Sequence, residues 1–248
     1  MTSSFGTMKQ ELRSKEETLN AGTKWTIEED NKITKIIDIA EQYDTISKDF
    51  DRSRIRIWNS VKDFLQPTKD NLKLLDAGCG NGKNMIYAIN HGYITKGFDI
   101  SNNLLEISRK KNLDVYYNNI LDINEDLYDK IICIAVIHHI NDVIKQKEAI
   151  INLINQLVLG GELLISVWSY EITLDIEKKN NKQHKDYRNF IVGHNYFKWN
   201  NKCDRYYYIH DYNSLSILIK NVSLECNIKY EITYEKQNWF CKIVKVSK

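Results

Sequence analysis

The chain has 248 residues, of which 42% are hydrophobic and 27% are charged, and its formal net charge is +2. This length favours one domain with an elaboration, and no stretch approaches the ~20 apolar residues that a membrane span requires, so no membrane partner is expected. Because the global charge is nearly balanced, a nucleic-acid partner would have to be bound by a local basic patch. The five cysteines include no C-x-x-C pair, which predicts neither a disulfide framework nor a metal site.

The N-terminal part of the sequence changes character at about residue 26. Residues 1–25 are polar and unpatterned, which is typical of a disordered or loosely attached tail. They contain no apolar core of a secretory signal, which favours a cytoplasmic or nuclear location. The remainder, 26–248, is expected to form a single domain.

Two helices are expected before any strand. Thr26 and Glu29 fit a capping box, and the apolar residues that follow at helical spacing predict a helix over 27–41. A second amphipathic run ends at Pro67, because proline cannot continue a helix. The range 26–66 is therefore expected to form a helical cover on the domain.

From Leu72 onward, short apolar runs alternate with stretches of helical periodicity. The expected strands are 72–76, 96–100, 113–117, 128–136 and 161–168, and the expected helices are 84–91, 102–111 and 143–158. This alternation is typical of parallel strands joined by helical crossovers, which is the α/β class. A helix near 211–220 and two further strands end the chain.

The segment 169–205 is expected to be irregular, and a loop of that length inside a compact domain is uncommon unless it is functional. The aromatic residues interleaved with its lysines and arginines are Tyr187, Phe190, Tyr196, Phe197 and Trp199. Such a composition suits stacking on bases and contacts to phosphates, which predicts a substrate loop. The alternative is a solvated loop with a small apolar anchor.

The sequence LLDAGCGNGKN, residues 74–84, combines the end of a strand, a turn with three glycines and the start of a helix. Glycines permit a tight turn and let a ligand lie against bare backbone. The spacing does not fit a phosphate-binding P-loop, which needs four residues between its glycines and Ser or Thr after its lysine. The dinucleotide fingerprint does not fit either, because Lys83 stands where the third glycine belongs.

Two carboxylates indicate which ligand the glycine loop binds. Asp76 ends the strand before the glycines, and Asp99 ends the next strand, where an acid can accept both hydroxyls of a ribose. S-adenosylmethionine carries a cationic amine, a sulfonium, a ribose and an adenine, and no phosphate. The arrangement resembles the class I S-adenosylmethionine-dependent methyltransferases. The alternative is a doubly wound domain with an unrelated glycine turn.

Five further stretches occur in a characteristic order. They are YDTISKDFDRSRIRIW (43–58), CIAVIHHI (133–140), LISVWSYE (164–171), DRYYYIHDYNSL (204–215) and QNWFCKIVK (237–245). Together they resemble the eukaryotic tRNA wobble-uridine methyltransferases that esterify 5-carboxymethyluridine. The resemblance implies a Rossmann-like class I fold with a seven-stranded, mostly parallel sheet.

The sequence departs from this family at two places. The family's segment ending in Val-Pro-Trp corresponds to FIVGHNYFKW, with Gly193 and His194 at the last two positions. Asn119 stands where the family usually has an acid that meets the adenine amine, although an amide oxygen can accept the same bond.

The resemblance also implies site residues, a cofactor and partners. The cofactor, S-adenosylmethionine, would be bound by Asp76, Ala77, Gly78, Gly80, Asn81, Asp99, Ile100, Asn119, Ile120 and Ala135. The methyl acceptor would be bordered by Trp58, Trp168, Arg205, Tyr206, Asn238 and Trp239. The implied partners are tRNA and a small zinc-binding activator subunit, to which the metal would belong.

The expected reaction is methyl transfer to a carboxylate whose pKa is ~4, so no catalytic base is needed at neutral pH. A cation or donors must hold that carboxylate in line with the methyl group. Arg54 is the first candidate, because the resemblance implies an arginine at this position and a guanidinium can bind a carboxylate through two hydrogen bonds. On residue type alone, the favoured alternative is a surface arginine on a covering helix. Of His138 and His139, which follow the fourth strand, one is expected to face the acceptor and the other to pack.

The expected function is therefore methylation of wobble 5-carboxymethyluridine in tRNA to its methyl ester. One alternative is a class I methyltransferase of a small carboxylate or amine. Another is a non-catalytic binding subunit with the same fold, against which the intact Asp76, Gly78, Gly80 and Asp99 count.

Overall fold

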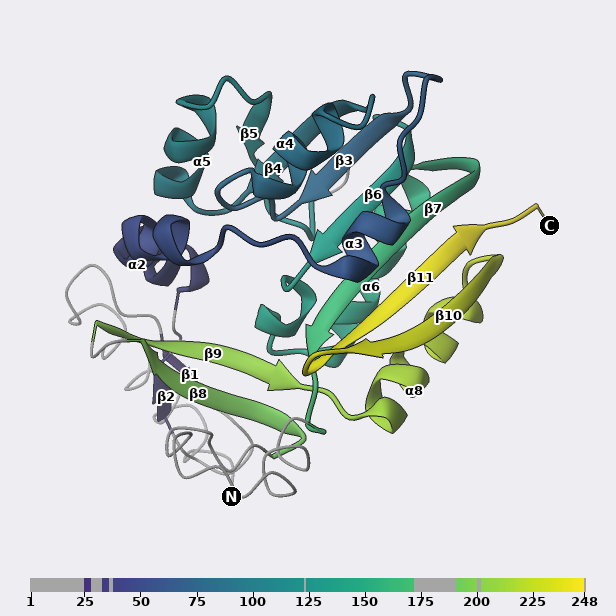
Figure 1. Cartoon of the computed structure of the whole chain (residues 1–248). Coiled ribbons are helices and arrows are strands. Elements are labelled where there is room, and N and C mark those ends of the chain that lie inside the picture. The colour runs from purple at the N-terminus through teal and green to yellow at the C-terminus, as the bar shows by residue number, and fades with distance from the viewer. Residues whose placement is uncertain are drawn as a thin grey trace, which may run out of the picture. The chain divides into compact units, whose positions relative to one another are not determined.

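The computed structural model describes residues 25–27, 33–35, 38–122, 124–171, 191–199 and 202–247. The chain divides into two compact units, Met1–Asp38 and Ile39–Lys248. The second unit carries the large sheet and its helices (Figure 1). Among the described residues, no helix is both long and apolar enough to cross a membrane.

The first unit contains two short strands, β1 (Trp25–Ile27) and β2 (Ile33–Lys35), which pair in antiparallel register. The helix predicted over 27–41 is therefore wrong, and the first described helix, α2, covers Ile39–Ser53. The physical reason is that this stretch is rich in β-branched Thr and Ile, which favour strands over helices.

The second predicted helix is present but short. It is α3 (Asn59–Phe64), which ends before Pro67 as expected. Val61 and Phe64 of this helix are buried and pack with Leu74 and Phe240 of the sheet. The helical cover of the second unit therefore consists of α2 and α3.

The sheet of the second unit has seven strands in the order β10-β11-β7-β6-β3-β4-β5 (Figure 1). Their bounds are β3 Lys73–Ala77, β4 Ile94–Asp99, β5 Val115–Tyr117, β6 Tyr128–Ile134, β7 Leu157–Trp168, β10 Ile228–Glu235 and β11 Asn238–Lys245. Strands β7 to β5 run parallel, and β11 is antiparallel to both of its neighbours. The predicted α/β class with a seven-stranded, mostly parallel sheet is confirmed.

Helices flank both faces of this sheet. They are α4 Lys83–Ile89, α5 Asn102–Arg109, α6 Val143–Asn155 and α8 Tyr212–Ser223, with a 3-10 turn, η1, at Ile137–His139. Neighbouring strand residues point to opposite faces: Leu75 packs with residues of α6 and α8, whereas Leu74 packs with α3 and α4. Burial on both faces explains why the central strands read as continuous apolar runs.

The segment predicted as an irregular loop over 169–205 contains regular structure. Strands β8 (Gly193–Trp199) and β9 (Cys203–Ile209) form an antiparallel ribbon. Side chains of β8 alternate between buried and exposed positions, a period of two that favours a strand. The aromatic residues Tyr187 and Phe190 lie outside the described residues.

The order of the strands determines where a ligand can bind. From β3 the chain proceeds to β4 and β5 on one side and then returns to β6 and β7 on the other. The carboxyl ends of β3 and β6 therefore form a topological switch point, which is where open α/β sheets bind ligands.

Candidate active site

A cavity of about 1360 Å³ lies at this switch point. Its wall is formed by the glycine loop after β3, the carboxyl ends of β4, β6 and β7, the end of α2, and one face of the β8–β9 ribbon. One part of the wall is backbone-rich and anionic, and another part is aromatic and cationic.

The glycine loop depends on the absence of a side chain at Gly78. This residue has a φ of +77°, and a Cβ built on it would overlap the Val136 side chain. The N–H groups of Gly78 and Cys79 both donate to the Phe98 carbonyl at 2.8 Å. The loop thus lies tightly against β4, and its backbone forms part of the cavity wall.

Asp99, at the end of β4, lines the cavity and is held by the backbone. Its Oδ2 accepts a hydrogen bond from Gly80 N–H at 2.8 Å, and its Oδ1 accepts one from Ser101 N–H at 2.9 Å. Burial raises the pKa of Asp99, and these backbone donors oppose that rise. Each oxygen retains a lone pair, so the carboxylate can also accept the two hydroxyls of a ribose.

Asp76 is buried immediately before the glycine loop, and neither of its oxygens has a hydrogen-bond partner among the described residues. Burial, and then the charge of Asp99, raise the pKa of Asp76 to about 7, whereas Lys83 opposes the rise. A buried carboxylate without a donor is costly, so a ligand with a positive charge at this loop suits it. Asp76 and Ala77 themselves lie behind the cavity wall.

The other predicted cofactor residues line the cavity together. They are Gly78, Gly80, Asn81, Asp99, Ile100, Asn119, Ile120 and Ala135. The amide oxygen of Asn119 accepts a hydrogen bond from Leu121 N–H at 3.0 Å, so one of its two lone pairs is already occupied within the same loop. Ala135 has a φ of +61°, a strained conformation for a residue with a Cβ, and such strain is concentrated at functional sites.

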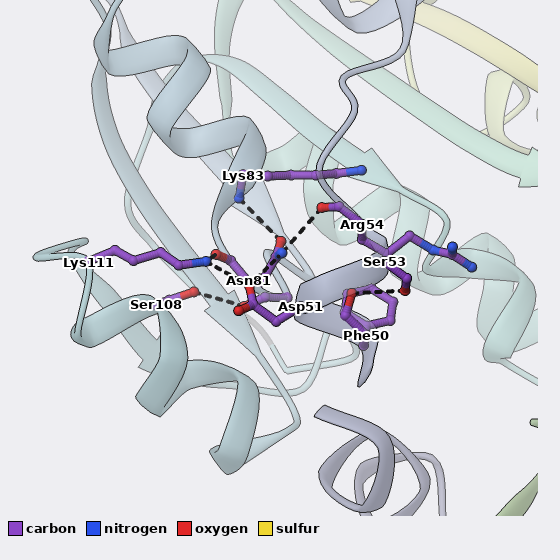
Figure 2. Close-up of polar contacts among 9 residues, drawn as sticks. Phe50, Asp51, Ser53, Arg54, Asn81, Lys83, Ser108 and Lys111 are labelled. Atoms are coloured by element: carbon purple, nitrogen blue, oxygen red, sulfur yellow. Dashed lines mark hydrogen bonds and ion pairs between the residues drawn. The ribbon is translucent and has the colours of Figure 1, made fainter. Parts of the chain in front are cut away.

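Helix α2 is clasped to the glycine loop by polar contacts (Figure 2). Asn81 Nδ2 donates to Asp51 Oδ1 at 2.9 Å and to the Arg54 carbonyl at 3.3 Å. Lys111 Nζ donates to the same Asp51 oxygen at 2.8 Å and to the Asn81 carbonyl at 2.9 Å. This clasp joins the end of α2 to Asn81, which lines the cavity. Asp51 and Lys111 were not predicted, because their partners are distant in the chain.

Arg54 lines the aromatic part of the cavity and is half-buried. Its side chain extends away from Asn81 in Figure 2. The guanidinium carbon lies 5.8 Å from the centre of the Phe50 ring and 5.5 Å from that of Trp199. The predicted candidate is therefore in the cavity, and Trp199, which was predicted only as part of the loop, is beside it.

The two histidines line the same cavity but differ in their hydrogen bonds. His139 Nδ1 donates to the Tyr206 carbonyl at 2.8 Å, so its Nε2 accepts from the Tyr43 hydroxyl at 2.8 Å. Burial first, and the nearby Arg205 cation as well, lower the pKa of His139 to about 3. His138 Nδ1 accepts from Trp168 N–H at 3.1 Å, and its Nε2 has no partner among the described residues.

Four of the six predicted acceptor residues line the cavity, namely Trp58, Trp168, Arg205 and Asn238. Two others do not, because adjacent residues of a strand point to opposite faces. Tyr206 turns away and bonds His194 Nδ1 at 2.9 Å, and Tyr207 takes its place in the wall. Trp239 Nε1 donates to Glu171 Oε2 at 2.9 Å, away from the cavity wall.

These features fit S-adenosylmethionine. The bonded Asp99 suits its ribose, the unpartnered Asp76 suits its positive charge, and the bare backbone at Gly78 allows close approach. Within the ranges that the structure describes, no group of three or more His, Cys, Asp or Glu is placed to hold a metal ion.

Comparisons with known proteins agree with this geometry. A family model described as a methyltransferase domain matches residues 50–213. The tRNA (carboxymethyluridine(34)-5-O)-methyltransferase of Arabidopsis thaliana is 35% identical over 131 residues, which are 52% of this chain and 32% of that protein. The protein of the same name from Saccharomyces cerevisiae is 32% identical over 133 residues, 52% of this chain and 47% of that protein. The chain thus spans less than half of the length of these curated relatives.

Solved structures share the fold at low sequence identity. An S-adenosylmethionine-dependent methyltransferase from Methanosarcina mazei has a TM-score of 0.59 and 14% identity, and the match covers 77% of this chain and 99% of that one. A methyltransferase solved in complex with the Trm112 activator of Haloferax volcanii has a TM-score of 0.61 and 11% identity, with 85% and 99% coverage. Because the family model matches more than half of the chain, and the cavity fits the predicted S-adenosylmethionine cofactor, the chain belongs to the methyltransferase domain family and has the class I, Rossmann-like fold.

Proposed function

We propose that this chain transfers the methyl group of S-adenosylmethionine to the carboxylate of 5-carboxymethyluridine at the tRNA wobble position, which forms the methyl ester. The names of its relatives support this proposal. The observation that carries it is a single cavity that joins the Asp99 and glycine-loop wall to a wall with two arginines, Arg54 and Arg205. Neither arginine belongs to an ion pair of the described residues.

In this reaction the residues of the chain have to bind and orient the two reactants. The cofactor, when bound, supplies a methyl group carried on a sulfonium. The acceptor carboxylate has a pKa of ~4 and is ionised at neutral pH, so no residue has to remove a proton from it. The glycine loop and Asp99 orient one reactant, and the cationic wall orients the other, which makes the transfer effectively intramolecular.

The aromatic wall suits an acceptor attached to a nucleobase. Trp168 stacks on Tyr207 with ring centres 4.2 Å apart, and Trp199 lies against both arginines. Side chains of this kind stack on unpaired bases of RNA loops, such as those of an anticodon. We therefore propose tRNA as the macromolecular substrate.

A small activator subunit is part of the same proposal. It is supported by the Haloferax volcanii complex with its Trm112 activator. The metal of a zinc-binding activator would be held by that partner's own ligands. We expect the isolated chain to be poorly soluble or inactive and the addition of the activator to restore transfer. Full activity of the isolated chain, unaltered by the activator, would contradict this part of the proposal.

The proposal is tested with the chain and its activator, radiolabelled S-adenosylmethionine and two tRNA pools. One pool comes from cells that cannot form the ester and therefore carries the free carboxymethyl group, and the other is an unmodified transcript of the same tRNA. We expect label in the first pool and none in the second. Label in the unmodified transcript would contradict the carboxylate as acceptor, and transfer to small carboxylates alone would favour the small-molecule alternative.

A further inference from the structure

Three buried N–H donors in the cavity wall lack an acceptor among the described residues. They are Arg205 Nε, His138 Nε2 and Trp199 Nε1. Arg205 is 3% exposed and His138 is fully buried. Buried donors are almost always paired, and an unpaired donor is costly, so three of them in one wall indicate a ligand that supplies acceptors.

The three donors share their neighbours. The Arg205 guanidinium carbon lies 4.2 Å from the centre of the Trp199 ring and 5.1 Å from that of Tyr207. The His138 ring centre lies 5.0 Å from the same Tyr207 ring. Arg205 therefore contacts both Trp199 and Tyr207, and His138 lies beside the same Tyr207, so the three donors belong to one part of the cavity wall.

The charge of the donors in this wall indicates the charge of the ligand. His138 accepts a bond at Nδ1, so Nε2 carries the hydrogen, and burial lowers the pKa of His138 well below its ordinary value. The imidazole is therefore a neutral donor. Arg205 adds one positive charge, and no ion pair of the described residues includes it. One cation with two neutral donors suits a monoanion with two acceptor oxygens.

We propose that Arg205, His138 and Trp199 form the binding site for the carboxylate of the methyl acceptor. The identity of the acceptor rests on the proposed function, whereas the carboxylate class follows from the donors and the charge. Arg54 lies on the same Trp199 ring but is half-buried and has no unpartnered buried atom. Arg54 therefore positions Trp199 and the acceptor, and Arg205 contacts the carboxylate.

The discriminating measurement is the affinity for two anticodon stem-loops in the presence of S-adenosylhomocysteine. One carries 5-carboxymethyluridine, and the other carries the neutral amide, 5-carbamoylmethyluridine. For the unaltered chain we expect about 30-fold tighter binding of the carboxylate, as for a hydrogen-bonded charge. Arg205→Met should reduce this preference to below about threefold, and Arg205→Lys should restore only part of it.

Matched variants separate the site from general effects on structure. Trp199→Phe and His138→Phe each remove one donor and should reduce the preference several-fold. Arg54→Met should weaken both ligands alike and leave the preference, whereas Arg52→Met, an exposed residue paired with Asp49 outside the cavity, should change neither. Unchanged affinity for S-adenosylhomocysteine in each variant verifies that the cofactor side is folded.

Two results would overturn the inference. One is an unaltered chain that binds acid and amide equally, and the other is a preference that Arg54→Met abolishes and Arg205→Met retains. Acetate should compete with the carboxylate stem-loop and phosphate should not; the reverse would assign the wall to the RNA backbone and overturn the inference as well. A chain that shows the acid preference but forms no ester would refute the proposed function and leave the carboxylate site intact.

Discussion

Replacing Asp76 with asparagine removes the buried carboxyl group whose oxygens have no partner among the described residues. Burial and the charge of Asp99 raise the pKa of Asp76 from 3.8 to about 7. The folded state therefore retains a proton that the unfolded state releases between about pH 4 and pH 7. The stabilising contribution of the protonated form is complete below pH 4 and is lost as the pH rises through 7.

The size of this effect follows from the shift. About three pKa units correspond to about 4 kcal/mol in total, of which about 2–3 kcal/mol falls between pH 5 and pH 8. Three histidines act in the opposite direction, because their lowered pKa values make the folded state more stable as the pH rises; they are His138, His139 and His210. Their effect is the same in both proteins and cancels in the difference.

Urea unfolding of the cofactor-free wild type and of Asp76→Asn, at pH 5 and pH 8, measures this difference. We expect the stability of the wild type relative to the variant to fall by about 2–3 kcal/mol over this range. Calorimetry near pH 7 should also show proton release when the wild type binds S-adenosylmethionine, because a cationic ligand favours ionised Asp76, and none from this group in the variant. A pH-independent difference between the proteins, or equal proton release, would refute this interpretation of Asp76.

Three other predictions concern the cofactor wall. Asp99→Ala should weaken S-adenosylmethionine binding by about 1–3 kcal/mol, because ligand hydroxyls lose a charged acceptor; unchanged affinity by calorimetry in a folded variant would contradict this role. Gly78→Ala should lower the free energy of unfolding by more than about 2 kcal/mol, since the new Cβ overlaps Val136 at a positive φ. Val136→Ala in the same chain should recover part of that loss in urea titrations, and no recovery would locate the strain elsewhere. Ala135→Gly should leave the unfolding free energy unchanged or raise it by up to about 1 kcal/mol, because the strained φ is relieved. Ala88→Gly, inside α4, should lower it, and a similar loss at both positions in thermal denaturation would show that Ala135 is not strained.

Local periodicity predicted most of the fold. The alternation of apolar runs and helical stretches after Leu72 predicted five parallel strands near their observed positions, because central strands are buried on both faces. The glycine loop and Asp99 were predicted to bind the same ligand, and the structure places the Gly80 nitrogen 2.8 Å from Asp99 Oδ2. Their proximity follows from the topology of parallel strands, whose carboxyl ends meet at one edge.

The features that the sequence did not predict have physical causes that a single sequence does not display. The stretch before Ile39 has apolar residues whose spacing fits a helix as well as a strand. Its β-branched side chains favour the strand conformation, and the structure has strands β1 and β2 there. In β9 the structure places Tyr207 in the cavity wall, whereas the residue predicted there was Tyr206, its neighbour on the opposite face of the strand. The clasp between Asp51 and Lys111 joins residues that are distant in the chain, so no local pattern indicates it.

The proposed acceptor of the methyl group is the carboxylate of 5-carboxymethyluridine. Trideuteromethyl S-adenosylmethionine, the chain with its activator, and tRNA that lacks the ester test it by mass spectrometry of the digested nucleosides. We expect 5-carboxymethyluridine to be consumed, its trideuteromethyl ester to form in equal amount, and mild alkali to return the free acid. Alkali-stable label, or label on any other nucleoside, would show that the carboxylate is not the acceptor.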